Sequence, residues 1–227
     1  MADRQLTMTR KLLCVLPVQE RTAPLTSCAI KVSMQKSWGS SFLLMPFQVI
    51  VVSGSLRKAS FTTALCRAVC ALPASDRTGT SGEVSFVLRD YVRHLPTYDG
   101  DLDTDTPPAV VAEMRAELAE SHAVLIGTPE YNYNIPGGLK NFIDWASRPF
   151  AKHCLIGRRM GVFGCAPGDR GGKASVEYLR NMIPLFGATL IGPELLFPKI
   201  NTKIASDGSV DASVMEPLTA LVRELAA

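Results

Sequence analysis

The chain has 227 residues, of which 47% are hydrophobic and 20% charged, and its formal net charge at pH 7 is +3. This length suits one sizeable domain with a full hydrophobic core. The 17 Gly, 15 Pro and 6 Cys are ordinary numbers, which excludes collagen-like, disordered and disulfide-stapled classes.

The charge is unevenly distributed along the chain. Residues 1–45 carry six basic residues and two acidic ones, a net +4, and subtraction from the totals leaves 18 basic and 19 acidic residues, a net −1, over 46–227. A near-neutral body argues against nucleic acid as the main partner. The longest apolar runs, such as 47–52 and 123–127, are far too short to cross a bilayer, so no membrane association is expected.

A composition break at Met45-Pro46 divides the chain into an extension, 1–45, and a domain, 46–227. The extension is basic and rich in Ser and Thr, and we expect it to be mostly disordered. Three interpretations stay open for it: a signal-like segment around 11–17, an organelle transit peptide, or an over-called start codon, because Met34 and Met45 both precede the regular pattern. A cytoplasmic protein is expected unless the extension directs import into an organelle.

Six cysteines show no paired CxxC spacing. Cys66 and Cys70 lie four residues apart, which places them on one face of a helix and favours core packing over metal binding. No metal site is predicted, and reduced thiols fit a cytosol-like compartment better than disulfides do.

From Phe47 onward, strand and helix patterns alternate. Strands are predicted at 47–52, 84–88, 123–127, 159–165 and, interrupted at Gly192-Pro193, at 188–191 with 195–197. Helices are predicted at 60–71, 107–120, 136–145, 173–185 and 213–225. Five such units predict a doubly wound, five-stranded parallel sheet in a three-layer α/β/α arrangement, since an eight-fold barrel needs three more units. Ligands then bind beyond the carboxyl ends of the strands, at the turns after the first, third and fourth strands.

The first turn, 53–62, matches neither G-x-G-x-x-G nor G-x-x-x-x-G-K-[ST]. It offers hydroxyl groups, backbone amides before a helix and the guanidinium of Arg57, a combination that suits a phosphate monoester. The alternative is that Ser60 is only an N-cap and Arg57 a solvated loop residue.

The second turn, 128–142, alternates Tyr131 and Tyr133 with asparagines before Pro136, which suits a flat polar heterocycle. The alternative is a well-capped loop with surface tyrosines.

The third turn, 165–172, has three glycines that permit a close backbone approach to a ligand. Cys165, at the start of this turn, has no base nearby in sequence and is interpreted as inert.

Three such turns at one sheet edge, the first suited to a monophosphate, favour FMN over NAD as the tightly held ligand. Segments 54–60, 129–141 and 144–147 resemble the NADPH-dependent FMN reductase family, and within it the flavodoxin-like quinone and chromate reductases. The similarity covers about 47–225 and does not include 1–45. It implies a flavodoxin-like fold.

The resemblance also implies how FMN is bound. The implied FMN-binding residues are Ser53, Ser55, Arg57, Ser60, Phe61, Thr62, Pro129, Glu130, Tyr131, Asn132, Tyr133, Cys165 and Gly168. The first turn would bind the phosphate and the second would border the isoalloxazine ring, with Glu130 contributing its backbone rather than its carboxylate. Many family members have Asn in place of Thr62, and Ser in place of Cys165; the first difference predicts modest weakening of phosphate binding.

The activity implied is NAD(P)H-dependent reduction by way of FMN. NADPH would pass hydride to flavin N5 and leave, and a quinone, azo compound, metal oxyanion or free flavin would take the electrons at the same face, a ping-pong order. No catalytic side chain is expected, because the flavin does the chemistry.

A homodimer or homotetramer is implied, with the Tyr98-Asp99 region near a neighbour's flavin. Two alternatives remain: a flavin reductase that uses FMN as a diffusible substrate, and a non-enzymatic flavodoxin-type electron carrier.

Overall fold

The computed structural model describes residues 47–79 and 82–227, so the predictions for the extension 1–45 lie outside the described residues. Its sheet has five long strands, which are all parallel: β1 (Phe47–Ser53), β3 (Gly82–Arg89), β4 (Ala123–Thr128), β5 (Arg159–Cys165) and β6 (Thr189–Phe197). Their order is β3-β1-β4-β5-β6, and the two-residue β2 (Thr78–Gly79) pairs antiparallel with β3 at the edge. Counted over the long strands, this is the 2-1-3-4-5 order of flavodoxin-like folds, which confirms the predicted fold class.

Six α-helices lie within these described residues, where they connect and follow the strands. They are α1 (Phe61–Cys70), α2 (Tyr91–His94), α3 (Ala109–Glu120), α4 (Gly137–Ala146), α5 (Lys173–Met182) and α6 (Ala212–Leu225). Short 3₁₀ helices occupy Ala74–Asp76, Gly100–Leu102, Ile183–Phe186 and Ile200–Thr202.

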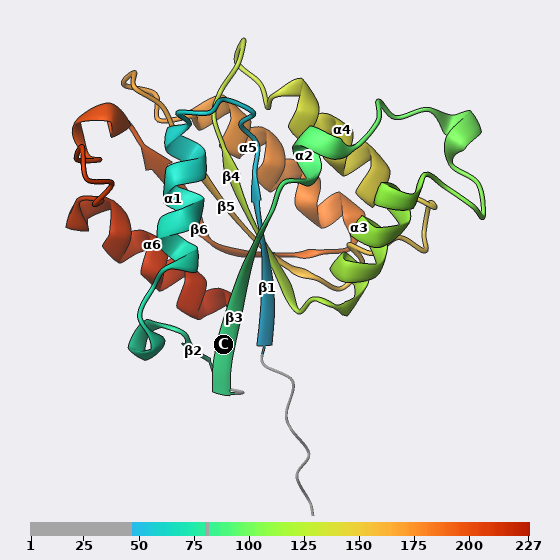
Figure 1. Ribbon diagram of the computed structural model, residues 1–227, viewed down its shortest axis with the longest axis horizontal. Helices are drawn as coiled ribbons and strands as arrows, with labels where there is room; N and C mark the ends of the chain where they lie inside the picture. The colour runs from blue at the N-terminus through green and yellow to red at the C-terminus, as the bar shows by residue number, and fades with distance from the viewer. Residues whose placement is uncertain (1–46, 80–81) are drawn as a thin grey trace, which may run out of the picture. The chain divides into compact units, whose positions relative to one another are not determined.

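The helices cover both faces of the sheet, as the three-layer prediction requires. Alternate residues of β1 point to opposite faces: Ile50 packs with α3, α4 and α5, whereas Val51 packs with α1 and α6. Figure 1 shows α1 and α6 on one side of the sheet and α3 and α4 on the other. Cys66 is buried in the cluster under α1 and the partly buried Cys70 packs against it, as predicted.

The predicted elements differ from the observed ones at a few positions. The predicted helix 173–185 ends as an α-helix at Met182, where a 3₁₀ turn containing Pro184 begins, because proline cannot continue the helical ladder. The last strand is continuous, and its register shifts around Gly192-Pro193 instead of breaking there. The single-turn α2 was not predicted, because four residues are too few to show a helical period.

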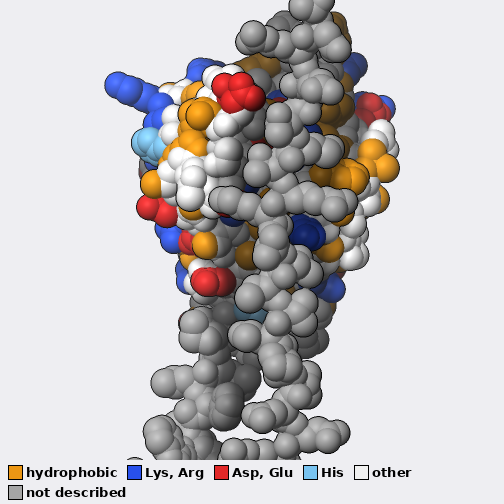
Figure 2. Space-filling view, turned by 90° about the vertical axis from the view of Figure 1, so that its right-hand side faces the viewer, with side chains coloured by type: hydrophobic (Ala, Val, Ile, Leu, Met, Phe, Trp, Pro, Cys, Tyr) orange, Lys and Arg blue, Asp and Glu red, His pale blue; other side chains and the backbone are white. Residues whose placement is uncertain are grey.

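None of the helices in the described ranges is long and apolar enough to span a membrane. On the face that Figure 2 shows, basic, acidic and hydrophobic side chains are interspersed over the visible surface of the described residues. This mixture agrees with the near-neutral charge of the body.

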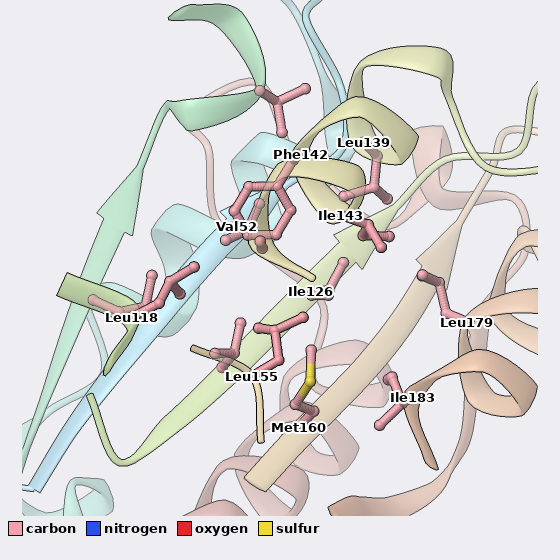
Figure 3. Close-up of a cluster of buried hydrophobic side chains, with 14 of the residues drawn as sticks. Val52, Leu118, Ile126, Leu139, Phe142, Ile143, Leu155, Met160, Leu179 and Ile183 are labelled. Atoms are coloured by element: carbon pink, nitrogen blue, oxygen red, sulfur yellow. The ribbon is translucent and has the colours of Figure 1, made fainter. Parts of the chain in front are cut away.

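The larger hydrophobic cluster lies between the sheet and α3, α4 and α5. Phe142 of α4 is fully buried in it, and Figure 3 shows its ring close to Val52, with Leu139 and Ile143 of the same helix beside it. This packing holds the start of α4 against the ends of β1 and β4.

Removing the Phe142 side chain tests how much this packing stabilises the fold. We expect Phe142→Ala to lower the free energy of unfolding by about 3–5 kcal/mol, because the substitution leaves a cavity. Urea denaturation measures it. Leu185→Ala is the control: Leu185 is 83% exposed, and its loss is expected to change stability by less than about 0.5 kcal/mol. Equal effects of the two substitutions would contradict the described core.

Candidate functional site at the carboxyl edge of the sheet

The chain leaves neighbouring strands β1 and β4 toward opposite faces of the sheet, because α1 covers one face and α4 the other. A crevice opens between connections that diverge in this way. The two strand ends stay joined by a hydrogen bond from Gly54 N to Gly127 O, 2.8 Å long. A Cβ at residue 54 would lie 2.9 Å from the end of the Leu139 side chain and 3.3 Å from Gly127 O, so this close approach favours glycine.

A hollow at this crevice, here called the polar hollow, brings together residues from all three predicted turns. It is lined by Ser55, Arg57, Ser60, Phe61, Thr62, Pro129, Glu130, Tyr131, Cys165, Ala166 and Pro167. All of these except Ala166 and Pro167 are predicted cofactor-binding residues. Topology thus joins segments that are more than one hundred residues apart in the chain.

The start of α1 supplies the hydrogen-bond donors of the polar hollow. Ser60 is the N-cap, and its hydroxyl oxygen accepts a hydrogen bond from Thr63 N at 3.1 Å. The backbone amides of Phe61 and Thr62, at the start of α1, have no acceptor within the helix, so they are available to an anion. The hydroxyl group of Ser55 and the guanidinium of Arg57 are available as well. Ser60 is therefore both an N-cap and a lining residue of the hollow.

Four predicted site residues lie outside the lining of the polar hollow. Ser53 instead exchanges a 2.8 Å hydrogen bond with the Thr63 hydroxyl group. Gly168 lies exposed in the third turn. Asn132 and Tyr133 form the tip of a tight hairpin, with positive φ angles of 51° and 59°.

The hairpin tip holds a defined shape through contacts within the protein. Tyr131 and Asn134 exchange two backbone hydrogen bonds of 3.0 Å each. Tyr133 is 74% exposed, and the Arg170 guanidinium lies 5.2 Å from the centre of its ring. Arg170 belongs to the third turn, so this cation–π contact joins the second turn to the third.

Glu130 makes a second connection between the same two turns. Its side chain is 11% exposed, and its carboxylate accepts hydrogen bonds from Arg170 Nε at 3.1 Å and from Ala174 N at 2.8 Å. The carboxylate is thus engaged within the protein, and the role of the Glu130 backbone toward the ligand stays a prediction. The role of Arg170 was not predicted, because nothing in the local pattern relates residues 40 positions apart.

Cys165 is buried beside Thr62, with 3.2 Å between its sulfur and the Thr62 hydroxyl oxygen. Burial raises the pKa of the Cys165 thiol to about 11, although the hydrogen bond with Thr62 opposes the shift. The thiol is therefore protonated at neutral pH and is a poor nucleophile. It can also donate to Thr62, which leaves the Thr62 O–H free to donate elsewhere.

The glycines of the third turn serve the fold. Gly171 and Gly172 have φ angles of 61° and 88°, and a Cβ on either would meet the backbone around Pro198 or Gly164. At Gly171 and Gly172 we expected a ligand to approach the backbone closely. The structure instead places other backbone of the protein there.

A second hollow adjoins the polar one. This apolar hollow is lined by Gly54, Leu56, Arg57, Tyr131, Pro136, Gly137 and Gly138, and it shares Arg57 and Tyr131 with the polar hollow. The polar hollow alone has a volume of about 80 Å³, well below that of typical ligand sites. A nucleotide that placed its phosphate there would therefore extend over neighbouring surface.

Residues 47–202 match the family described as NADPH-dependent FMN reductase, which is more than half of the chain. The chain belongs to this family. It is an oxidoreductase that uses FMN and NAD(P)H.

Similarity to individual proteins supports the assignment. A 2-hydroxy-1,4-benzoquinone reductase from a Burkholderia species is 33% identical over 167 residues, which are 73% of this chain and 86% of that protein. A quinone reductase of Escherichia coli K12 is 30% identical over 177 residues, 76% of this chain and 89% of that one. The solved structure of FerB, a flavoenzyme NAD(P)H:(acceptor) oxidoreductase from Paracoccus denitrificans, superposes with a TM-score of 0.67 at 31% identity, and covers 78% of this chain and 96% of FerB.

The residues of the polar hollow fit the FMN of this reductase family. The amides at the start of α1, the hydroxyl groups of Ser55 and Ser60 and the Arg57 guanidinium are donors that match a phosphate monoester. Pro129 and the half-exposed ring of Tyr131 provide apolar surface beside them. Within the described ranges, no three His, Cys, Asp or Glu side chains gather to hold a metal ion; the absence of a metal cofactor stays a prediction.

Substitution of Glu130 tests the connection between the second and third turns. We expect Glu130→Ala to destabilise the protein by about 1–3 kcal/mol, because the amide of Ala174 loses its buried acceptor. Glu130→Gln is expected to cost less, since an amide oxygen can still accept that hydrogen bond. Urea denaturation measures both effects. Glu177→Ala, which removes the half-exposed partner of Lys173, is the control, and a cost as large as that of Glu130→Ala would contradict the connection.

The raised pKa of Cys165 predicts slow alkylation. Relative to a thiol with the ordinary pKa of 9.0, we expect about a hundredfold less thiolate near pH 8. The rate of iodoacetamide modification, followed on the Cys165 peptide by mass spectrometry with glutathione as a reference, should still rise above pH 10. Modification of Cys165 as fast as glutathione at pH 7 would contradict the raised pKa.

Proposed function

We propose that the protein is an FMN-containing, NAD(P)H-dependent quinone reductase. One observation carries the proposal: the start of α1 and the segment 129–131 meet around a single hollow where β1 and β4 diverge. That arrangement suits both ends of a flavin mononucleotide. The quinone reductases among the relatives support quinones as the acceptor class.

Each turn has a proposed role in holding FMN. Ser55, Arg57 and Ser60 bind the phosphate, together with the amides of Phe61 and Thr62. The segment Pro129–Tyr131 borders the isoalloxazine ring, and the Asn132-Tyr133 tip lies beyond it. Ser53 orients the first turn through its hydrogen bond to Thr63, and Thr62 and Cys165 form the floor of the hollow.

FMN, when bound, would supply the redox chemistry between the nicotinamide and the acceptor. The protein's own groups bind and orient. Glu130 is the one carboxylate among the described residues that line the polar hollow, and it accepts hydrogen bonds from Arg170 and Ala174. Backbone amides stabilise negative charge without requiring any proton transfer from a side chain.

The shape of the site explains why several acceptors are proposed. Tyr131 is half-exposed and Leu56 and Pro136 line the adjoining apolar hollow, so a flat quinone or azo compound meets an open apolar surface. Metal oxyanions and free flavin remain in the proposed range. Donor and acceptor would use this one surface in turn, which gives ping-pong kinetics.

A homodimer or homotetramer is also proposed. Tyr98 is held by the Asn141 side chain, whose Oδ1 accepts from Tyr98 N at 2.7 Å, and its ring packs edge-on against Trp145. This fixed position suits the implied approach of the Tyr98-Asp99 region to a neighbour's flavin. Analytical ultracentrifugation tests this oligomeric state, and a monomer at micromolar concentration would contradict the proposal.

Cytoplasmic location stays a prediction, since fractionation of cells is needed to test it.

The visible spectrum of the desalted protein tests the function. We expect a bound yellow chromophore that bleaches when NADPH is added without oxygen and recovers when a quinone follows.

Arg57→Ala is expected to lower FMN affinity at least about tenfold, because a charged hydrogen bond to the phosphate is lost. Fluorescence titration with FMN measures it, and Arg180→Ala, on α5 and outside both hollows, is the control.

Other results of the spectral and kinetic tests would indicate other functions. A protein that keeps its flavin but ignores NADPH would be an electron carrier, and one that takes up FMN only transiently would use it as a diffusible substrate. A colourless protein that fails to take up FMN would overturn the proposal. Intersecting double-reciprocal lines for NADPH and quinone would contradict the ping-pong order.

A further inference from the structure

A third hollow lies beside the first turn, on the side toward β3. This basic hollow has a volume of about 390 Å³ and is lined by five cationic side chains, Arg57, Lys58, Arg67, Arg89 and Arg93, and by one acidic side chain, Asp90. The cations come from the first turn, α1, the end of β3 and α2. Arg57 lines all three hollows, so the basic hollow adjoins the proposed FMN site.

Two of the five cations are already paired. Arg89 donates from Nε to the Glu117 carboxylate at 2.7 Å, and Arg93 donates to Asp90 at 3.0 Å and to Leu56 O at 2.8 Å. Arg57, Lys58 and Arg67 make no side-chain hydrogen bond or ion pair with any residue in the described ranges. Three unpaired cations around one hollow repel one another, and an anion placed between them removes that repulsion.

The charge balance indicates how much negative charge the basic hollow accepts. In the proposed FMN site, Arg57 serves the flavin phosphate. The remaining four cations, Lys58, Arg67, Arg89 and Arg93, face two carboxylates, Asp90 and Glu117, which leaves two positive charges. A phosphate monoester carries between one and two negative charges at neutral pH, and arginine binds such a group through two parallel hydrogen bonds.

We propose that the basic hollow binds a second phosphate monoester, the adenosine 2′-phosphate of NADPH. The inference rests on the proposed function, because the nicotinamide must lie at the flavin while the other end of the dinucleotide reaches past Arg57. The 2′-phosphate is the one group that NADPH has and NADH lacks, so these cations would set the preference for NADPH. Arg67 is the clearest contributor, since its guanidinium has no other partner among the described residues.

The preference between the two dinucleotides tests the proposal. With FMN-loaded protein and a fixed quinone, we expect kcat/KM for NADPH to exceed that for NADH by at least tenfold. In Arg67→Gln that ratio should fall about tenfold, because one charged hydrogen bond to the phosphate is lost. Lys152→Gln, in the segment between α4 and β5 and outside the three hollows, removes the same charge and should leave the ratio within about twofold, since distant charges are screened.

A binding measurement separates the dinucleotide phosphate from a free anion. Adenosine 2′,5′-bisphosphate should compete with NADPH in the wild-type protein and about tenfold less well in Arg67→Gln, whereas inorganic phosphate should compete weakly in both. Equally strong competition by inorganic phosphate would make the hollow a free-phosphate site and overturn the assignment. An unchanged dinucleotide ratio in Arg67→Gln would overturn it too. If the wild-type protein oxidises neither dinucleotide, the proposed function itself fails, which is a distinguishable result.

Discussion

The divergence of the chain after β1 and β4 is the constraint on which the site depends. The two strands are neighbours in the sheet, but the helices that follow them cover opposite faces, so their first turns separate at the edge. The bond from Gly54 N to Gly127 O keeps the strand ends together below this separation. The result is an opening with a helix start on one side and a rigid aromatic turn on the other.

Arg57 lies where the three hollows of this edge meet. Each hollow has a different chemical character: hydroxyl groups and helix amides in the first, apolar side chains in the second, and unpaired cations in the third. The phosphate groups and flat rings of a flavin nucleotide and a phosphorylated dinucleotide complement these three characters. One guanidinium can therefore contribute to binding both nucleotides of the proposed reaction, and its neighbours, such as Arg67, would decide which dinucleotide is accepted.

The second turn must keep its shape without a ligand, because Asn132 and Tyr133 both adopt left-handed backbone angles that cost free energy in non-glycine residues. Its stability comes from the third turn. Arg170 contacts the Tyr133 ring and the Glu130 carboxylate, and the Ala174 amide donates to the same carboxylate. The ring-bordering surface is thus prepared in advance, which lowers the entropy lost on binding.

The sequence by itself determined the alternation of five strands with helices, because apolar periodicity and proline positions are local signals. It also determined which turns carry hydroxyl, amide and aromatic groups. Nine residues expected at the cofactor do line one hollow. Only the tertiary structure decided that Glu130 binds Arg170, that Thr62 contacts Cys165 and that Arg67 shares a hollow with Arg93. Such pairs join residues far apart in the chain, and their meeting depends on strand order and helix packing, for which no local pattern codes.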